Sequence, residues 1–164
     1  MSDSRTISLP DTGYFVIAPD LLGHGFARRG SDYTIATLAD ELRPYFMTGD
    51  DHPYDIVIGH SLGCLVASVL FPLLKSTRPV RAVLVDPPFE LTPESVVIAK
   101  AYICDSVRNP KTPEGYQREW PLCTKEDAAI ASLSAHLCDV ATVEAIFDVR
   151  LLVPYDRVVL TWLV

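Results

Sequence analysis

The sequence predicts an α/β fold built on a mostly parallel sheet. Two observations lead to this prediction. Short apolar runs alternate with helical patterns over the first half of the chain, and a glycine-flanked serine stands between one such run and the next helix. The 164 residues, 49% hydrophobic and 21% charged, suffice for one domain with a core. Strands that alternate with helices over so few residues imply parallel pairing through right-handed crossovers.

The first half of the chain supplies the predicted sheet. Apolar runs at Tyr14–Ala18 and Tyr54–Ile58 predict strands buried on both faces, and a third strand is expected at Val80–Val85. Apolar residues at helical spacing predict helices at 35–46 and 62–74, between these strands.

The second half of the chain is predicted to be a helical block. Thr92-Pro93-Glu94 and Thr112-Pro113-Glu114 each place an N-cap residue before a proline at the first helical position. A third helix is expected to start at Thr124 and a fourth to run over Val140–Asp148. A strand is expected only at the terminal run Arg157–Val164.

The segment Gly59-His60-Ser61-Leu62-Gly63 carries the clearest chemical signal. It is a G-x-S-x-G pattern directly after a predicted strand and directly before a predicted helix, the context of a nucleophile elbow. A turn tight enough to raise a serine hydroxyl above the sheet strains the serine backbone, and glycines on both sides remove Cβ atoms that would clash. Ser61 is therefore the predicted nucleophile, and the N–H of Leu62 is the predicted oxyanion donor.

Two segments, 13–25 and 55–63, resemble the α/β-hydrolase superfamily in its lipase, esterase and epoxide-hydrolase-like branch. They are similar to that family's fourth strand with its following loop, and to its fifth strand with the elbow. The resemblance implies one domain with a core at 12–90 and 151–164 and a helical lid at 91–150.

The same resemblance implies a partial fold, incomplete at both ends. The family's first strands, its His-Gly oxyanion loop, and the loops with its usual acid and its histidine have no counterpart. The family's third strand, which lies between the fourth and fifth, is also missing, and Thr6–Leu9 is expected to be a poor substitute. Reduced stability and impaired activity are expected, because unpaired backbone groups in a sheet cost about 1 to 3 kcal/mol each.

The sequence offers four histidines as candidates for the general base of Ser61. His52 precedes the strand that leads to the serine and is excluded by distance. His60 is expected to line the pocket. His24 stays open as a surrogate base or a structural turn residue, and His136 is expected to be a helical histidine at the surface.

Asp86 is the predicted acid, because it ends a strand at the sheet edge where α/β enzymes place catalytic groups. Some branches of the family use this position for the triad acid. The alternative is a turn-starting aspartate before Pro87. Asp20 also follows a strand and is expected to be structural.

Charge and cysteine usage restrict the partners. With 21 acidic and 14 basic residues the net charge is -7, which disfavours nucleic acid and anionic membranes. No leader or membrane span is predicted, and four dispersed cysteines favour reduced thiols in a cytoplasmic protein without a metal site.

The predicted function is a serine hydrolase that forms an acyl-enzyme with a small apolar ester or acyl substrate and needs no cofactor. Two alternatives stay open: a non-catalytic protein that binds a small ligand on this fold, and a truncated product without activity. The sequence predicts neither the substrate nor the oligomeric state.

Overall fold

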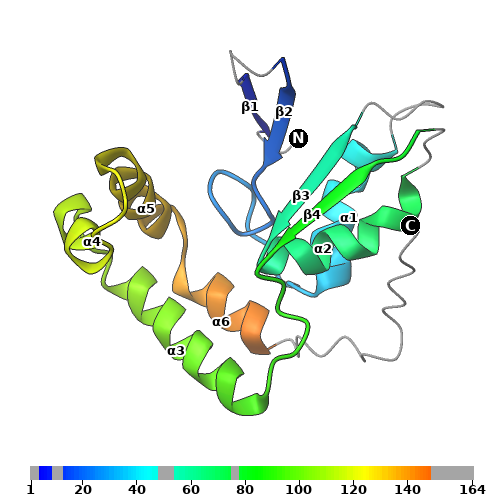
Figure 1. Cartoon of the computed structure of the whole chain (residues 1–164). Coiled ribbons are helices and arrows are strands. Elements are labelled where there is room, and N and C mark those ends of the chain that lie inside the picture. Colours follow the sequence, from blue (N-terminus) through cyan, green and yellow to red (C-terminus); the bar gives the residue numbers. More distant parts are fainter. Residues whose placement is uncertain (1–3, 9–12, 48–53, 75–77, 149–164) are drawn as a thin grey trace. The chain divides into compact units, whose positions relative to one another are not determined.

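The computed structural model describes residues 4–8, 13–47, 54–74 and 78–148 (Figure 1). The chain divides into two compact units. Unit 1 comprises Met1–Asp32 and Pro93–Phe147, and unit 2 comprises Tyr33–Thr92 and Asp148–Val164. The predicted terminal strand at 157–164 lies outside the described residues.

Unit 2 contains the parallel part of the fold. Strands β3 (Ile56–His60) and β4 (Arg81–Val85) pair in parallel, with Ile58 opposite Val83. Helices α1 (Ile35–Phe46) and α2 (Leu62–Leu70) were both predicted, and the 3₁₀ turn η1 (Phe71–Leu73) continues α2. The α/β class with a parallel sheet is therefore confirmed in this unit.

The core of unit 2 lies where α2 packs against β3 and against α1 (Figure 1). The most deeply buried side chains of the two helices, at 1% exposed or less, are Leu38, Ala39, Cys64, Val66 and Leu70. On the strands, by contrast, Ile58 is 69% and Val83 43% exposed. The prediction that Tyr54–Ile58 is buried on both faces is wrong for Ile58. Helix α2 packs on the face of β3 toward which Gly59 points, and Ile58, the preceding residue of the strand, points to the opposite face.

Unit 1 begins with an antiparallel pair of strands. Strand β1 (Ser4–Ser8) pairs with β2 (Phe15–Pro19), with Thr6 opposite Ile17. The strand predicted at Tyr14–Ala18 is confirmed within one residue, but its burial on both faces is not, since Phe15 is 74% exposed. The partner strand β1 includes Thr6–Ser8, part of the segment that is expected from the sequence to be a poor substitute for a missing strand.

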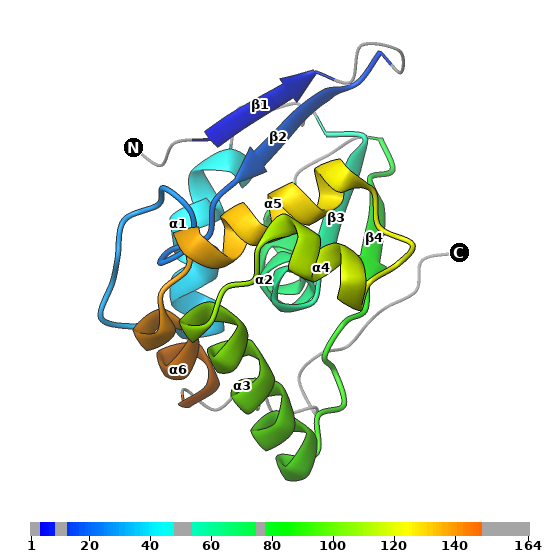
Figure 2. The ribbon, with the colours of Figure 1, turned by 90° about the vertical axis from the view of Figure 1, so that its left-hand side faces the viewer.

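The rest of unit 1 is the predicted helical block. It consists of α3 (Pro93–Arg108), α4 (Pro113–Glu119), α5 (Lys125–Leu137) and α6 (Val140–Asp148). Helices α4 and α5 pack side by side (Figure 2). The predicted caps at Thr112 and Thr124 are confirmed: the Thr112 hydroxyl accepts the Gly115 N–H at 3.2 Å, and Thr124 forms a capping box with Asp127.

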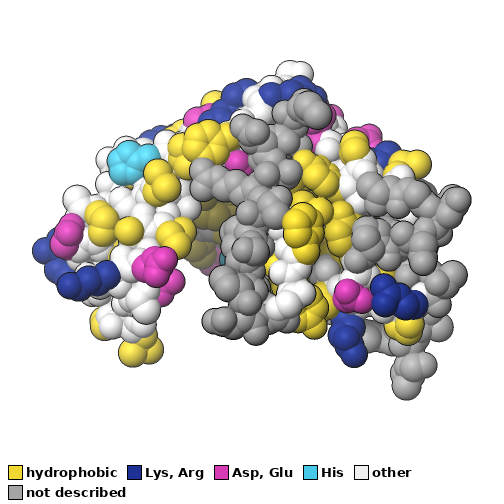
Figure 3. Space-filling model, turned by 90° about the horizontal axis from the view of Figure 1, so that it is seen from above, with side chains coloured by type: hydrophobic (Ala, Val, Ile, Leu, Met, Phe, Trp, Pro, Cys, Tyr) yellow, Lys and Arg dark blue, Asp and Glu magenta, His cyan; other side chains and the backbone are white. Residues whose placement is uncertain are grey.

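Large hydrophobic side chains remain on the surface of both units (Figure 3). In unit 1 they include Ile98 of α3, Leu122 between α4 and α5, and Leu133 of α5. No single described helix is long and apolar enough to cross a membrane; α5 and α6 reach that length only as a pair bent by 79°.

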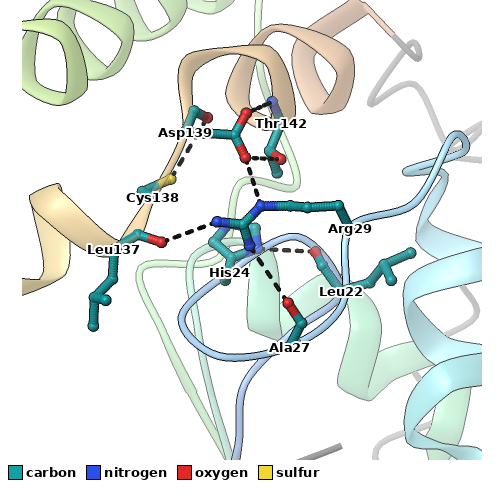
Figure 4. Close-up of polar contacts among 8 residues, drawn as sticks. All are labelled: Leu22, His24, Ala27, Arg29, Leu137, Cys138, Asp139 and Thr142. Carbon is teal, nitrogen blue, oxygen red and sulfur yellow. Dashed lines mark hydrogen bonds and ion pairs between the residues drawn. The ribbon is translucent and has the colours of Figure 1, made fainter.

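A polar cluster joins the loop after β2 to the turn between α5 and α6 (Figure 4). The Arg29 Nε lies 2.8 Å from the Asp139 carboxylate, and its guanidinium also donates to the Leu137 carbonyl at 3.3 Å. The Thr142 N–H and hydroxyl donate to the same carboxylate at 2.8 and 2.7 Å. Burial raises the pKa of Asp139, but the Thr142 hydrogen bonds and Arg29 outweigh it, so the pKa is lowered overall.

The capping box of α5 predicts a pH-dependent contribution to stability. Hydrogen bonds from Thr124 lower the pKa of Asp127. The contribution is therefore complete above the unfolded value of about 3.9 and is lost as pH falls through the lower folded value. We expect Asp127→Ala to lower the melting temperature at pH 7, with the gap to the wild type shrinking as pH falls from about 5 toward 2. In Glu126→Ala, which leaves the Thr124 bonds in place, the gap at pH 7 should be smaller; equal gaps would contradict the capping-box argument.

Candidate active site

Ser61 occupies a strained turn between a strand and a helix. Strand β3 ends at His60 and α2 begins at Leu62, so Ser61 is the single residue between them. Its φ of 47° and ψ of -118° lie in a region that non-glycine residues rarely adopt. Such a conformation costs about 1 to 3 kcal/mol and persists only where the surroundings impose it. The strained serine that the sequence predicted is therefore confirmed.

Two backbone hydrogen bonds impose this conformation. The Ser61 N–H donates to the Val85 carbonyl at 2.9 Å, and the Ser61 carbonyl accepts the Cys64 N–H at 2.9 Å. The first bond ties the turn to the end of β4, and the second starts the first turn of α2. Ser61 itself is half-buried.

The two glycines of the motif have different roles. A Cβ atom on Gly59 would lie 2.7 Å from the Gly63 carbonyl oxygen and 2.9 Å from the Cα of Cys64. Only glycine at 59 allows α2 to approach β3 this closely. A Cβ atom on Gly63 would meet nothing within 4 Å among the described residues, so the expectation of a clash is wrong at that position.

Asp86 leaves the neighbouring strand at the same edge of the sheet. The register pairs His60 with Val85, so Ser61 and Asp86 follow adjacent residues of parallel strands. Asp86 has a φ of 49°, and among the described non-glycine residues only it and Ser61 have a positive φ. A residue before proline is normally extended, so this value is unusual at Asp86. The structure thus brings the predicted nucleophile and the predicted acid together, as two strained neighbours.

Leu62 is the first residue of α2. Its N–H is one of the first four that the helix cannot satisfy internally, and it lies at the positive end of the helix dipole. These properties suit a backbone donor to an oxyanion beside Ser61.

Cys64 also lies at this turn, where the sequence predicts only a reduced thiol. Its side chain is fully buried. The sulfur lies 3.2 Å from the Gly59 carbonyl oxygen and 3.3 Å from the Val85 carbonyl oxygen. Burial raises the pKa of the thiol, the Val85 hydrogen bond lowers it and the charge of Asp86 raises it, so Cys64 stays protonated at neutral pH. Its one sequence signal was its place one helical turn after Ser61.

The histidines fall into different parts of the molecule. Within the described part of unit 2, His60 is the only histidine, and it is exposed at the end of β3. His24 in unit 1 has its Nδ1 3.1 Å from the Leu22 carbonyl oxygen. His136 is exposed on α5, with its Nδ1 2.7 Å from the Ser132 carbonyl oxygen, and His52 lies outside the described residues.

Asp20 has a structural role, as the sequence suggested. Its carboxylate accepts the Phe26 N–H at 3.0 Å and so closes the loop after β2. Gly23 and Gly25 have φ of 80° and 52°, which only glycine adopts without strain. A side chain on Gly25 would also overlap the Asp20 carboxylate. Among the described residues, no group of three histidine, cysteine, aspartate or glutamate side chains could hold a metal ion.

A parallel strand pair, a strained serine at its carboxyl edge and a helix that starts at this serine define an α/β protein of the hydrolase class. Comparison with known families agrees: the chain matches the alpha/beta hydrolase family over residues 6–163 and belongs to it. It is a hydrolase by descent. No curated protein matches the chain significantly.

The contrast between the two glycines predicts opposite effects of alanine. Gly59→Ala forces the backbone of α2 away from β3, and we expect a loss of about 1 to 3 kcal/mol in the free energy of unfolding. Gly63→Ala adds a methyl group in open space within a helix and should be neutral or stabilising, by up to about 1 kcal/mol. Urea unfolding of both variants measures the difference. Equal destabilisation would contradict the close approach at Gly59.

Proposed function

We propose that the chain is a serine hydrolase that acts on a carboxylic ester or a related acyl substrate through an acyl-enzyme. The observation that carries the proposal is the φ of 47° at Ser61 between β3 and α2. A strained serine at this point is the geometry of a nucleophile elbow, here formed by Gly59, His60, Ser61, Leu62 and Gly63. Family membership supports hydrolysis as the reaction class.

In the proposed reaction the Ser61 oxygen attacks the substrate carbonyl carbon. A bond forms from the serine oxygen to this carbon, and the carbonyl electron pair moves to its oxygen, where the Leu62 N–H and the dipole of α2 stabilise the negative charge. The serine proton passes to a general base; the electron pair then returns from the oxyanion, the bond from the carbonyl carbon to the alkoxy oxygen breaks, and the alcohol leaves with that proton. Water repeats the sequence on the acyl-enzyme and releases the acid.

Asp86 is the proposed acidic member of the site. The family resemblance implies that a histidine accepts the serine proton, and a carboxylate orients such a histidine and stabilises its charged form. Asp86 follows β4 as Ser61 follows β3, so the two residues leave adjacent strands at the same edge of the sheet. The proposed mechanism needs no cofactor or metal.

The proposed substrate is small and apolar, and the proposed lid is the helical segment 91–150. This segment carries large hydrophobic side chains that are not buried, among them Trp120, which contacts Tyr116 with ring centroids 5.0 Å apart. Side chains of this kind suit an acyl or aryl group.

Labelling of Ser61 tests the proposed chemistry. An activated alkyl phosphonate should form a phosphorus–oxygen bond with the Ser61 hydroxyl and lose its leaving group, giving one label per chain by mass spectrometry. Ser61→Ala should abolish the label. Ser68→Ala is the matched control, because Ser68 lies on the same helix with its hydroxyl bonded to the Cys64 carbonyl at 2.8 Å, and labelling should persist. If the wild type takes no label but its melting temperature rises when an apolar ester is added, the chain is a binding protein and the proposed hydrolase function is wrong.

Removal of the Asp86 charge tests the proposed acid. Asp86→Asn keeps a residue that tolerates a positive φ, so the fold should be retained. We expect the labelling rate constant of Ser61 to fall by about a hundredfold, the lower end of what acid–base groups contribute. Asp55→Asn, at the opposite end of the strands and paired with Arg78 at 3.5 Å, should label at the wild-type rate. An unchanged rate in Asp86→Asn would remove Asp86 from the mechanism.

A further inference from the structure

Cys64 occupies the point where three elements of the candidate site meet. It lies on α2, its sulfur reaches the carbonyl of Gly59 in β3, and it also reaches the carbonyl of Val85 at the end of β4. Cys64 is 0% exposed, and its two polar contacts show that its side chain forms hydrogen bonds as well as packing in the core.

The Val85 carbonyl links this thiol to both functional residues. The same oxygen that lies 3.3 Å from the Cys64 sulfur accepts the Ser61 N–H. The carbonyl also belongs to the peptide bond that leads into Asp86, so its orientation affects the backbone of that residue. A donor at position 64 therefore acts on Ser61 and Asp86 through one shared peptide group.

Chemistry and space both restrict the residue at this position. A thiol has one hydrogen, which it donates weakly to one carbonyl at a time, and its size fills the space between helix and strands. Alanine fills less of this space and donates nothing, whereas serine donates more strongly and is nearly isosteric. The two replacements separate the hydrogen bond from the packing.

We propose that Cys64 is a positioning residue of the hydrolase site, which holds Ser61 and Asp86 in register through the Val85 and Gly59 carbonyls. This inference rests on the proposed function. It assigns Cys64 no contact with substrate and no covalent step.

The experiment compares the rate of phosphonate labelling at Ser61 with the melting temperature in three variants. Cys64→Ala should slow labelling about fivefold to tenfold, the effect of one lost hydrogen bond. Cys64→Ser should recover most of the rate. Cys104→Ala is the matched control, because Cys104 is a buried thiol of α3, and it should lower the melting temperature without changing the labelling rate.

Three results would overturn the positioning role: an unchanged rate in Cys64→Ala, an equal loss of rate in the alanine and serine variants, or an equal slowing in Cys104→Ala. If the wild type itself takes no label, the proposed function fails. Amide hydrogen exchange at Ser61 and Asp86 then tests whether Cys64 positions these two residues. Faster exchange in Cys64→Ala that is restored in Cys64→Ser supports the role, and unchanged exchange overturns it.

Discussion

The candidate site depends on one backbone group, the carbonyl of Val85. By accepting the Ser61 N–H it extends the pairing of β3 with β4 one residue beyond the strands, at the point where the serine backbone turns into a strained conformation. Glycine at 59 is the second requirement, because it lets the first turn of α2 pack closely against β3. Strain at Ser61 is thus held by packing and hydrogen bonding together, which is how proteins usually retain such conformations.

Much of this arrangement could be predicted from the sequence because its signals are local. A helix cap depends on residues three positions apart, so Thr112 and Thr124 could be read directly, and both caps are confirmed. The strand, turn and helix around Ser61 are likewise encoded within a few residues by an apolar run, two glycines and an apolar helix.

Other features depend on partners distant in the sequence. The segment Ser4–Ser8 forms a strand because β2 offers it hydrogen bonds; the alternation from Thr6 onward is too short and weak to predict this pairing. The exposure of Ile58 depends on which face the helices cover, which an unbroken apolar run does not specify. The positive φ of Asp86 contradicts the local preference of a residue before proline, and the contacts of Cys64 require knowledge of where β4 ends.

The cluster around Arg29 combines two kinds of attachment that respond differently to the solvent. The side chains of Arg29 and Asp139 are 45% and 39% exposed, so dissolved ions weaken the attraction between their charges. The hydrogen bonds from Thr142 to Asp139, and from the guanidinium to the Leu137 carbonyl, depend less on ionic strength. At high ionic strength the loop after β2 would therefore loosen gradually from the turn between α5 and α6 rather than detach at once.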